Sequence, residues 1–216
     1  MSPSVHPGPG RGTLLIADIT GYTAFLQAVS EAHAADLAAG TFVPEAYPLL
    51  TSLLDGIVER VAPPFVVSEV EGDAVFTFAP DGELELRGPS VLACLAGCYE
   101  GYRARLEAAR DLMICTCDAC SSIGGLELKF VMHHGDYVVQ PIAGRQRVLG
   151  PDVTVAHLLL KNHVRDVIGR SAYALLTDVA VTHLEVPVDH AHRVTEEYDH
   201  YPTIRGYVVT LPLQPG

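Results

Sequence analysis

Two aspartates and a group of three cysteines have spacings that suggest chemistry in this chain. Asp18 lies at the end of an apolar run, and Asp73 lies between two short apolar segments. Cys115, Cys117 and Cys120 fall within six residues of one another. Carboxylates suit hard divalent cations such as Mg²⁺ or Mn²⁺, whereas clustered thiolates suit Zn²⁺. The sequence therefore predicts two metal sites of different chemistry.

The segment around Asp18 predicts a buried strand that runs directly into a helix. Residues 14–17 are continuously apolar, and the apolar positions from residue 22 onward follow helical spacing. Two interpretations of Asp18 stay open at this point. Its carboxylate can meet a ligand at the carboxyl end of the strand, or it can accept N–H bonds from the first turn of the helix.

Asp73 is predicted to lie at the tip of a hairpin. Residues 65–71 and 74–78 are strand-like and are separated only by Gly72-Asp73. Gly and Asp are ordinary turn residues, so the importance of Asp73 depends on its pairing with Asp18. In an α+β, ferredoxin-like arrangement the first strand's end and the hairpin's tip meet at one edge of the sheet, which would bring the two acids together.

The other elements follow from apolar periodicity. Helices are expected at 49–61, 90–110 and 151–164, strands at 173–177 and 207–211, and a second hairpin whose turn is 133–136. We expect a mixed or antiparallel sheet flanked by helices. The domain organisation predicted is a flexible leader at 1–12, a single domain at 13–212 and a cysteine-rich insert at 111–125.

The balance of charged residues limits the classes of molecule that the chain is expected to bind. The 216 residues include 14 Lys and Arg against 26 Asp and Glu, a formal charge of −12. That balance argues against nucleic-acid binding and favours metal cations, or a nucleotide carried with them. Without a signal peptide or an apolar run of membrane-spanning length, and with an odd number of cysteines, we expect a cytoplasmic protein with no membrane partner.

The cysteine group needs a fourth ligand to complete a zinc site. The candidates are His133, His134, His157 and Cys98, and His133 is our working assignment. Free loop thiols and a redox switch with a Cys117–Cys120 disulfide remain alternatives. Cys94 and Cys98 share one face of the predicted 90–110 helix and are expected to pack in the core.

Several motifs in sequence order resemble the class III nucleotidyl (adenylate/guanylate) cyclase homology domain. They are residues 17–23, 71–75, 134–136 followed by 150–156, and the closing strand at 204–207. The resemblance covers nearly the whole chain and implies a ferredoxin-like cyclase fold. The Cys-x-Cys-x-x-Cys insert and residues 157–162 resemble an uncharacterised bacterial branch of cyclase-like proteins.

The resemblance implies a role for each motif. Asp18 and Asp73 would hold two Mg²⁺ or Mn²⁺ ions for in-line phosphoryl displacement. Glu69 and Arg147 occupy positions that contact the purine. Backbone amides after Asp18 would approach the phosphates; this segment is Ile19, Thr20, Gly21, Tyr22 and Thr23.

The chain also departs from the family pattern. Thr154 and Leu158 stand where the family has its transition-state asparagine and arginine. Loss of one such charge donor typically costs about 10²- to 10³-fold in rate, although His157 or Lys161 can supply a cation from the same helix. In the family the sites form across a two-fold interface, which implies a homodimer with Thr154, His157 and Lys161 facing the partner's acids.

Two functions are therefore expected. The first is a signalling protein that binds a purine nucleoside triphosphate with divalent metal, with weak or lost cyclase (phosphorus–oxygen lyase) activity. The second is a non-catalytic sensor or interaction domain whose function depends on a zinc or redox-active cysteine site.

Overall fold

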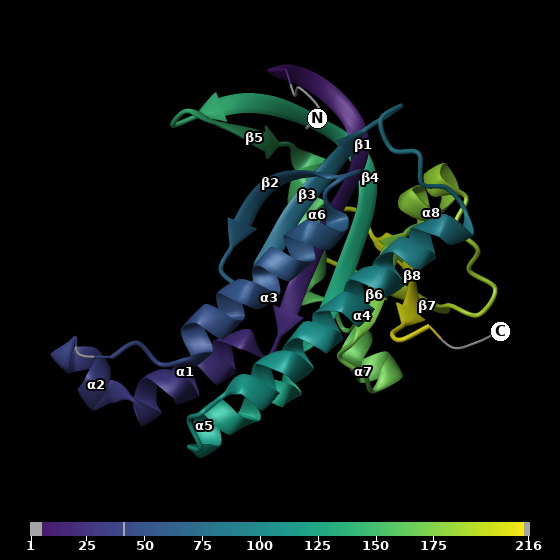
Figure 1. The fold of residues 1–216 in the computed structure, drawn as a ribbon. Helices are drawn as coiled ribbons and strands as arrows, with labels where there is room; N and C mark the ends of the chain where they lie inside the picture. Colours follow the sequence, from purple (N-terminus) through teal and green to yellow (C-terminus); the bar gives the residue numbers. More distant parts are fainter. Residues whose placement is uncertain (1–5, 41, 214–216) are drawn as a thin grey trace.

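A single sheet of eight strands forms the centre of the computed structural model, which describes residues 6–40 and 42–213 (Figure 1). The strand order is β2-β3-β1-β4-β6-β8-β7, with β5 added to β4. Only the pairing of β4 with β6 is parallel among the pairs described. The strands are β1 (Gly8–Thr20), β2 (Val66–Glu71), β3 (Ala74–Pro80), β4 (Glu127–Ile142), β5 (Arg145–Leu149), β6 (Tyr173–Thr177), β7 (His192–Glu196) and β8 (Ile204–Thr210).

Helices pack on both faces of this sheet. The long helices α3 and α4 lie across one face, and α6 packs on the other (Figure 1). The helices are α1 (Tyr22–Ala32), α2 (Ala34–Ala39), α3 (Ala46–Val61), α4 (Pro89–Leu112), α5 (Asp118–Ser121), α6 (Pro151–Leu158), α7 (Val164–Ile168) and α8 (Asp178–Leu184), with 3₁₀ turns η1 (Ser122–Gly125) and η2 (Leu159–Lys161). The predicted α+β class with a mixed, mostly antiparallel sheet is confirmed.

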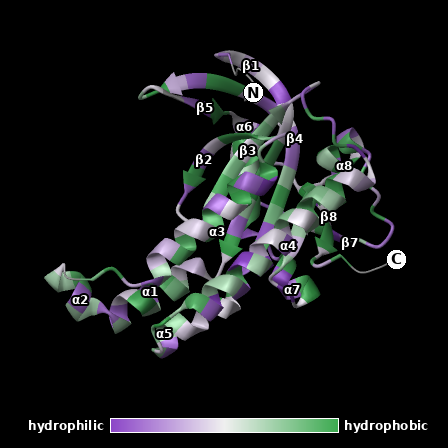
Figure 2. Ribbon diagram, viewed as in Figure 1, coloured by the Kyte–Doolittle hydropathy of each residue, from purple (hydrophilic) through white to green (hydrophobic). Residues whose placement is uncertain are grey.

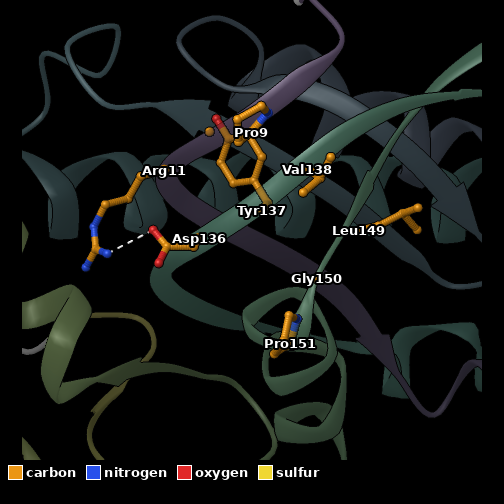
Figure 3. A pocket seen from close by; sticks show the side chains of 9 residues that line it. Pro9, Arg11, Asp136, Tyr137, Val138, Leu149, Gly150 and Pro151 are labelled. Atoms are coloured by element: carbon orange, nitrogen blue, oxygen red, sulfur yellow. Dashed lines mark hydrogen bonds and ion pairs between the residues drawn. The ribbon is translucent and has the colours of Figure 1, made fainter.

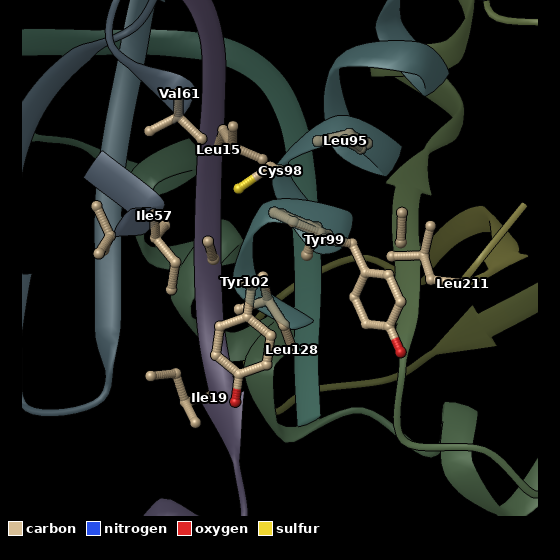
Figure 4. Close-up of a cluster of buried hydrophobic side chains, with 14 of the residues drawn as sticks. Leu15, Ile19, Ile57, Val61, Leu95, Cys98, Tyr99, Tyr102, Leu128 and Leu211 are labelled. Atoms are coloured by element: carbon tan, nitrogen blue, oxygen red, sulfur yellow. The ribbon is translucent and has the colours of Figure 1, made fainter. Parts of the chain in front are cut away.

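Strand β1 is buried on both faces, as its apolar run predicts. Leu15 and Ile19 face α3 and α4, where Ile57 and Tyr102 enclose them (Figure 4), whereas Ile16 belongs to the cluster under α6. In the hydropathy colouring the central parts of the strands are mostly hydrophobic, whereas the helices carry a mixture of hydrophobic and hydrophilic residues (Figure 2). Because β1 is packed on both faces, the positions of its last residues, including Asp18, are well defined.

The predicted position of the second hairpin's turn, at residues 133–136, is wrong. β4 continues through residues 133–136 as one 16-residue strand, and the turn comes later, at Ala143 and Gly144, which both have positive φ. Gly135 suggested a turn, but it pairs with Gly12 inside the ladder. A Cβ at Gly135 would overlap the Asp152 carboxyl group, so this glycine serves close packing.

The expected flexible leader is also wrong from Gly8 onward. Residues 8–12 form the first part of β1 and pair with β4. A Cβ at Gly10 would meet the Tyr137 ring, and one at Gly12 would overlap the backbone carbonyl of Ala79. These glycines allow close approach within the sheet, although their pattern resembles that of a loop. Residues 1–5 of the expected leader lie outside the described residues.

Within the described ranges, none of the helices combines the length and apolar character needed to cross a membrane.

We predict that Gly12→Ala destabilises the fold by about 1–3 kcal/mol, because the backbone of β3 cannot move away from the new methyl group. Gly97→Ala is the matched control. Gly97 lies within α4 with nothing near its absent Cβ, so alanine there should stabilise by roughly 0.5–1 kcal/mol. Urea unfolding measures both variants, and equal midpoints would contradict this account of the β1–β3 contact.

Candidate functional site

The structure brings Asp18 and Asp73 to the same edge of the sheet. Asp18 pairs with Ala74 in the β1–β3 ladder, and the N–H of Ile19 donates to the backbone carbonyl of Asp73 at 3.0 Å. Asp18 is 9% exposed, while Asp73 is half-buried in the turn between β2 and β3. Both acids therefore lie where β1 ends and α1 begins.

Lys129 supplies a positive charge beside these acids. It lies directly opposite Asp18 in the β1–β4 ladder, with Nζ 2.9 Å from Asp18 Oδ2. The same Nζ donates to the carbonyl of Leu160 at 2.9 Å. Lys129 is a site residue that the sequence motifs did not identify. A lysine between the apolar residues Leu128 and Phe130 was the available signal, but the residue it faces depends on the strand register.

One ammonium group does not relieve all of the repulsion between the carboxylates. Burial and the negative charge of Asp18 raise the pKa of Asp73, whereas its own backbone N–H and Lys129 act to lower it. Burial and Asp73 also raise the pKa of Tyr22, in the first turn of α1. A further positive charge beside Asp18 and Asp73 would therefore be electrostatically favourable.

The first turn of α1 presents backbone N–H groups without an acidic side chain. Gly21 is the N-cap residue, with φ of 91°, and no side chain caps the helix. Asp18 thus does not cap α1, and its partner is Lys129. The predicted segment Ile19, Thr20, Gly21, Tyr22 and Thr23 connects Asp18 to this helix start. A helix N-terminus of this kind favours anions.

The two predicted purine-contacting residues contact each other. Glu69 in β2 forms an ion pair with Arg147 in β5, and both side chains are about a quarter exposed, at 26%. Their polar groups satisfy one another within the chain, so a bound base would have to share or replace this pair.

The predicted site residues of α6 and of the following 3₁₀ turn η2 are exposed or half-buried. The Thr154 hydroxyl donates to the Gly150 carbonyl at 3.2 Å, and Lys161 is exposed. His157 packs edge-on against Phe76, with ring centroids 5.0 Å apart, and Leu158 is half-buried. Of the two predicted substitutes for the family's arginine, Lys161 is the more accessible cation.

Two surface hollows lie away from these acids. One, of about 410 Å³, is lined by Arg11, Asp136 and Tyr137 at the start of β1 (Figure 3), where Arg11 and Asp136 form a 2.9 Å ion pair. Another of about 410 Å³ includes Arg11 and His134. Asp18 lies seven residues after Arg11 along β1, a distance of about 23 Å in a strand. Neither hollow is lined by Asp18 or Asp73.

His33 takes the place that we expected for His133. Its Nε2 lies 3.6 Å from Cys115 Sγ and 3.4 Å from the Sγ atoms of Cys117 and Cys120. His133 instead contacts Thr177 at the end of β6 and Asp152 in α6, so the assignment of His133 as fourth ligand is wrong. His33 ends α1, 82 residues before Cys115, and only the folded chain brings them together.

The other three expected ligands also lie elsewhere. His134 stacks on His183 with ring centroids 3.6 Å apart, His157 packs on Phe76, and Cys98 is buried in α4 as core. Asp81 lies beside the histidine stack, 3.2 Å from His183 Nε2. Because stacked rings direct their nitrogens into separate parallel planes, this trio is poorly arranged to share an ion.

The three clustered thiols have different acidities. The N–H of Cys120 lowers the pKa of the Cys117 thiol to about 7. Burial and the neighbouring sulfurs raise the pKa of Cys120 to about 12. All five cysteines are free thiols in the structure. Full ionisation of the cluster therefore requires a compensating cation.

The family described as "Protein of unknown function (DUF2652)" matches residues 50–167, more than half of this chain. The chain belongs to this family. An uncharacterized protein of Mycobacterium tuberculosis, Rv2561/Rv2562, is 30% identical to this DUF2652 chain over 141 residues, which are 64% of the chain and 62% of that relative. The match thus spans about three fifths of the relative's length.

Solved structures show which fold this DUF2652 chain has. The guanylyl cyclase Cya2 superposes with a TM-score of 0.67 at 14% identity, covering 95% of each chain. The adenylyl cyclase CyaB from P. aeruginosa gives 0.64 at 14% identity, covering 98% of this chain and 100% of that one. The guanylate cyclase domain of RhGC from Catenaria anguillulae, in complex with GTP, gives 0.58 at 13% identity, with coverages of 93% and 96%. The chain has the class III cyclase fold, and the resemblance in its motifs is confirmed at that level.

We predict that Asp73→Asn raises the melting temperature at pH 7 in buffer without added Mg²⁺ or Mn²⁺. The pKa of Asp73 is raised in the folded state, so its ionisation opposes folding above that pKa and has no effect below the unfolded value near 3.9. The advantage of asparagine should therefore shrink as the pH falls toward 4. A thermal series from pH 4 to 7 measures it, and a constant difference across the series would contradict the assignment.

Proposed function

We propose that this chain binds a purine nucleoside triphosphate together with Mg²⁺ or Mn²⁺ on Asp18 and Asp73, with weak or lost cyclase activity. The observation that carries the proposal is the meeting of these two acids beside the start of α1. Carboxylates and backbone amides at one edge match the two parts of such a ligand, since the acids hold divalent cations and the amides favour phosphate oxygens.

The donor set at this edge fits a hard divalent cation. Asp73 has a raised pKa that additional positive charge would reverse, and the ligand atoms are oxygens. When bound, such ions lower the pKa of a coordinated hydroxyl and neutralise phosphate charge. Before loading, Lys129 holds the Asp18 carboxylate in place through their 2.9 Å ion pair. A divalent cation therefore competes with Lys129 for Asp18.

The base would be recognised near Glu69 and Arg147. Their ion pair offers a carboxylate acceptor and guanidinium donors, a combination that can pair with either purine once the two side chains separate. We further propose that a second copy of the chain completes the site, as the likeness to cyclase domains implies. In that homodimer Thr154 and Lys161 face the partner's acids.

We expect cyclase turnover to be slow, because Leu158 stands where the cyclase family has a charged arginine. This side chain cannot stabilise charge on a leaving pyrophosphate, and His157 is held against Phe76 in its own chain. Lys161 remains as the cation, without the bidentate geometry of arginine. We also propose a signalling role and, because the five cysteines are free thiols, a location in the cytoplasm, where free thiols persist.

The second candidate function is a non-catalytic sensor that uses the cysteine cluster. The cluster of His33 with three cysteines favours it, since this group is independent of Asp18 and Asp73. Under that hypothesis, substitutions at the two acids leave the protein's role intact.

We predict that Asp18→Asn weakens Mn²⁺-dependent binding of GTP and ATP at least 10-fold, because the carboxylate is a metal ligand. Glu71→Gln is the matched control, since Glu71 is an exposed acid beside the same turn. Calorimetric titration with and without Mn²⁺ measures both variants. Unchanged nucleotide affinity in Asp18→Asn would contradict the proposed site.

We also predict that Leu158→Arg increases Mn²⁺-dependent formation of cyclic nucleotide, by up to about 10²- to 10³-fold, because it restores a charge donor to α6. Val167→Arg is the control, since it adds the same charge at a position that is 60% exposed. Chromatographic assay of the cyclic product measures the effect. Equal rates for the two variants would contradict the role assigned to this position.

A further inference from the structure

We propose that His33, Cys115, Cys117 and Cys120 bind one structural Zn²⁺ ion, which fastens the end of α1 to α5. The four ligand atoms lie within 4.8 Å of one another. Three thiolates with one imidazole are a characteristic closed tetrahedral zinc set. The site is separate from Asp18 and Asp73 and does not depend on nucleotide binding.

The contacts around His33 Nε2 are not explained by hydrogen bonding. An imidazole nitrogen has either one proton or one lone pair, so it forms one good hydrogen bond. Here three sulfur atoms surround Nε2 at 3.4, 3.4 and 3.6 Å. Three equivalent neighbours around one nitrogen are the arrangement expected when all four atoms surround a common ion.

The separations also match zinc quantitatively. Zn–S bonds of about 2.3 Å and a Zn–N bond of about 2.0–2.1 Å at tetrahedral angles place sulfur about 3.5 Å from nitrogen. The three observed S···N distances, 3.4–3.6 Å, lie around that value. The donor set also selects the metal, because soft thiolates disfavour Mg²⁺ and Mn²⁺.

Backbone contacts hold the cysteine loop in this shape. Glu45, just before α3, accepts from the N–H groups of Ile114 and Cys115 at 2.9 and 3.2 Å. The N–H of Cys120 points at Cys117 Sγ at 3.4 Å. The Cys120 N–H stabilises charge on the Cys117 sulfur, and the two bonds to Glu45 fix the backbone that presents Cys115 before an ion binds.

His33 is similarly oriented. Asp36 Oδ2 lies 3.8 Å from its Nδ1, on the ring atom that does not face the sulfurs. A carboxylate on that side favours the tautomer with a proton on Nδ1 and a free lone pair on Nε2. The His33 side chain is 12% exposed, Cys120 is buried, and Cys115 and Cys117 are partly buried, so the site lies near the surface with one side packed against the core.

The position of the ion suggests its role. α1 has 11 residues, and its first turn lies beside Asp18 while His33 follows its last turn. At about 1.5 Å per residue the ion would be about 16 Å from the helix start. Zinc at this end holds α1 against α5 and thereby fixes the direction of the helix that begins at the acids.

The test is the zinc content of the full chain, purified under reducing conditions from zinc-supplemented cells. We expect about one zinc per chain by mass spectrometry of the metal, and thiolate-to-metal charge-transfer absorption when Co²⁺ replaces it. His33→Ala should lose most of the zinc. His133→Ala is the matched control and should keep it, and His33→Cys should also keep it as a four-thiolate site.

Stability provides a second readout. Removal of the ion with a chelator should lower the melting temperature by roughly 5 °C or more, and His33→Ala should already be lowered and insensitive to the chelator. Circular dichroism verifies that each variant is folded. Zinc-free wild-type protein, zinc retained in His33→Ala, or a Cys117–Cys120 disulfide in place of metal under reducing conditions would each overturn the proposal.

Discussion

The register of β1 between β3 and β4 is the constraint on which the rest of the structure depends. It places Asp18 opposite Ala74 on one side and opposite Lys129 on the other. A slip by one residue would turn every β1 side chain to the other face of the sheet. Burial of alternate residues against α3 and α4 and against α6 makes such a slip costly. The same packing that forms the core therefore fixes the acid site.

The charged groups of this fold differ in how far their charge is balanced by other side chains. Asp18 has an ammonium partner in Lys129, and Glu69 has Arg147. Asp73 keeps a raised pKa although Lys129 acts to lower it, and in the cysteine cluster three sulfur atoms surround one imidazole nitrogen. A bound cation would stabilise the ionised ligand atoms at both places, and both proposals concern metals.

Local patterns in the sequence predicted much of the fold but not its long-range contacts. The switch from strand to helix after Asp18 and the turn at Gly72-Asp73 are encoded by residues near one another, and both were predicted. Gly135 was misinterpreted because a glycine that permits close packing resembles one that permits a turn. His33 was missed because its partners lie more than 80 residues away, and nothing in an alanine-rich helix end distinguishes it.

The most direct measurement is a crystal structure of the full chain grown with Mn²⁺ and a non-hydrolysable GTP analogue, with anomalous scattering recorded at the manganese edge. The account predicts manganese between Asp18 and Asp73, with the Asp18–Lys129 ion pair broken and the phosphates at the start of α1. A nucleotide bound elsewhere, or an intact Asp18–Lys129 pair with no manganese at this edge, would contradict it.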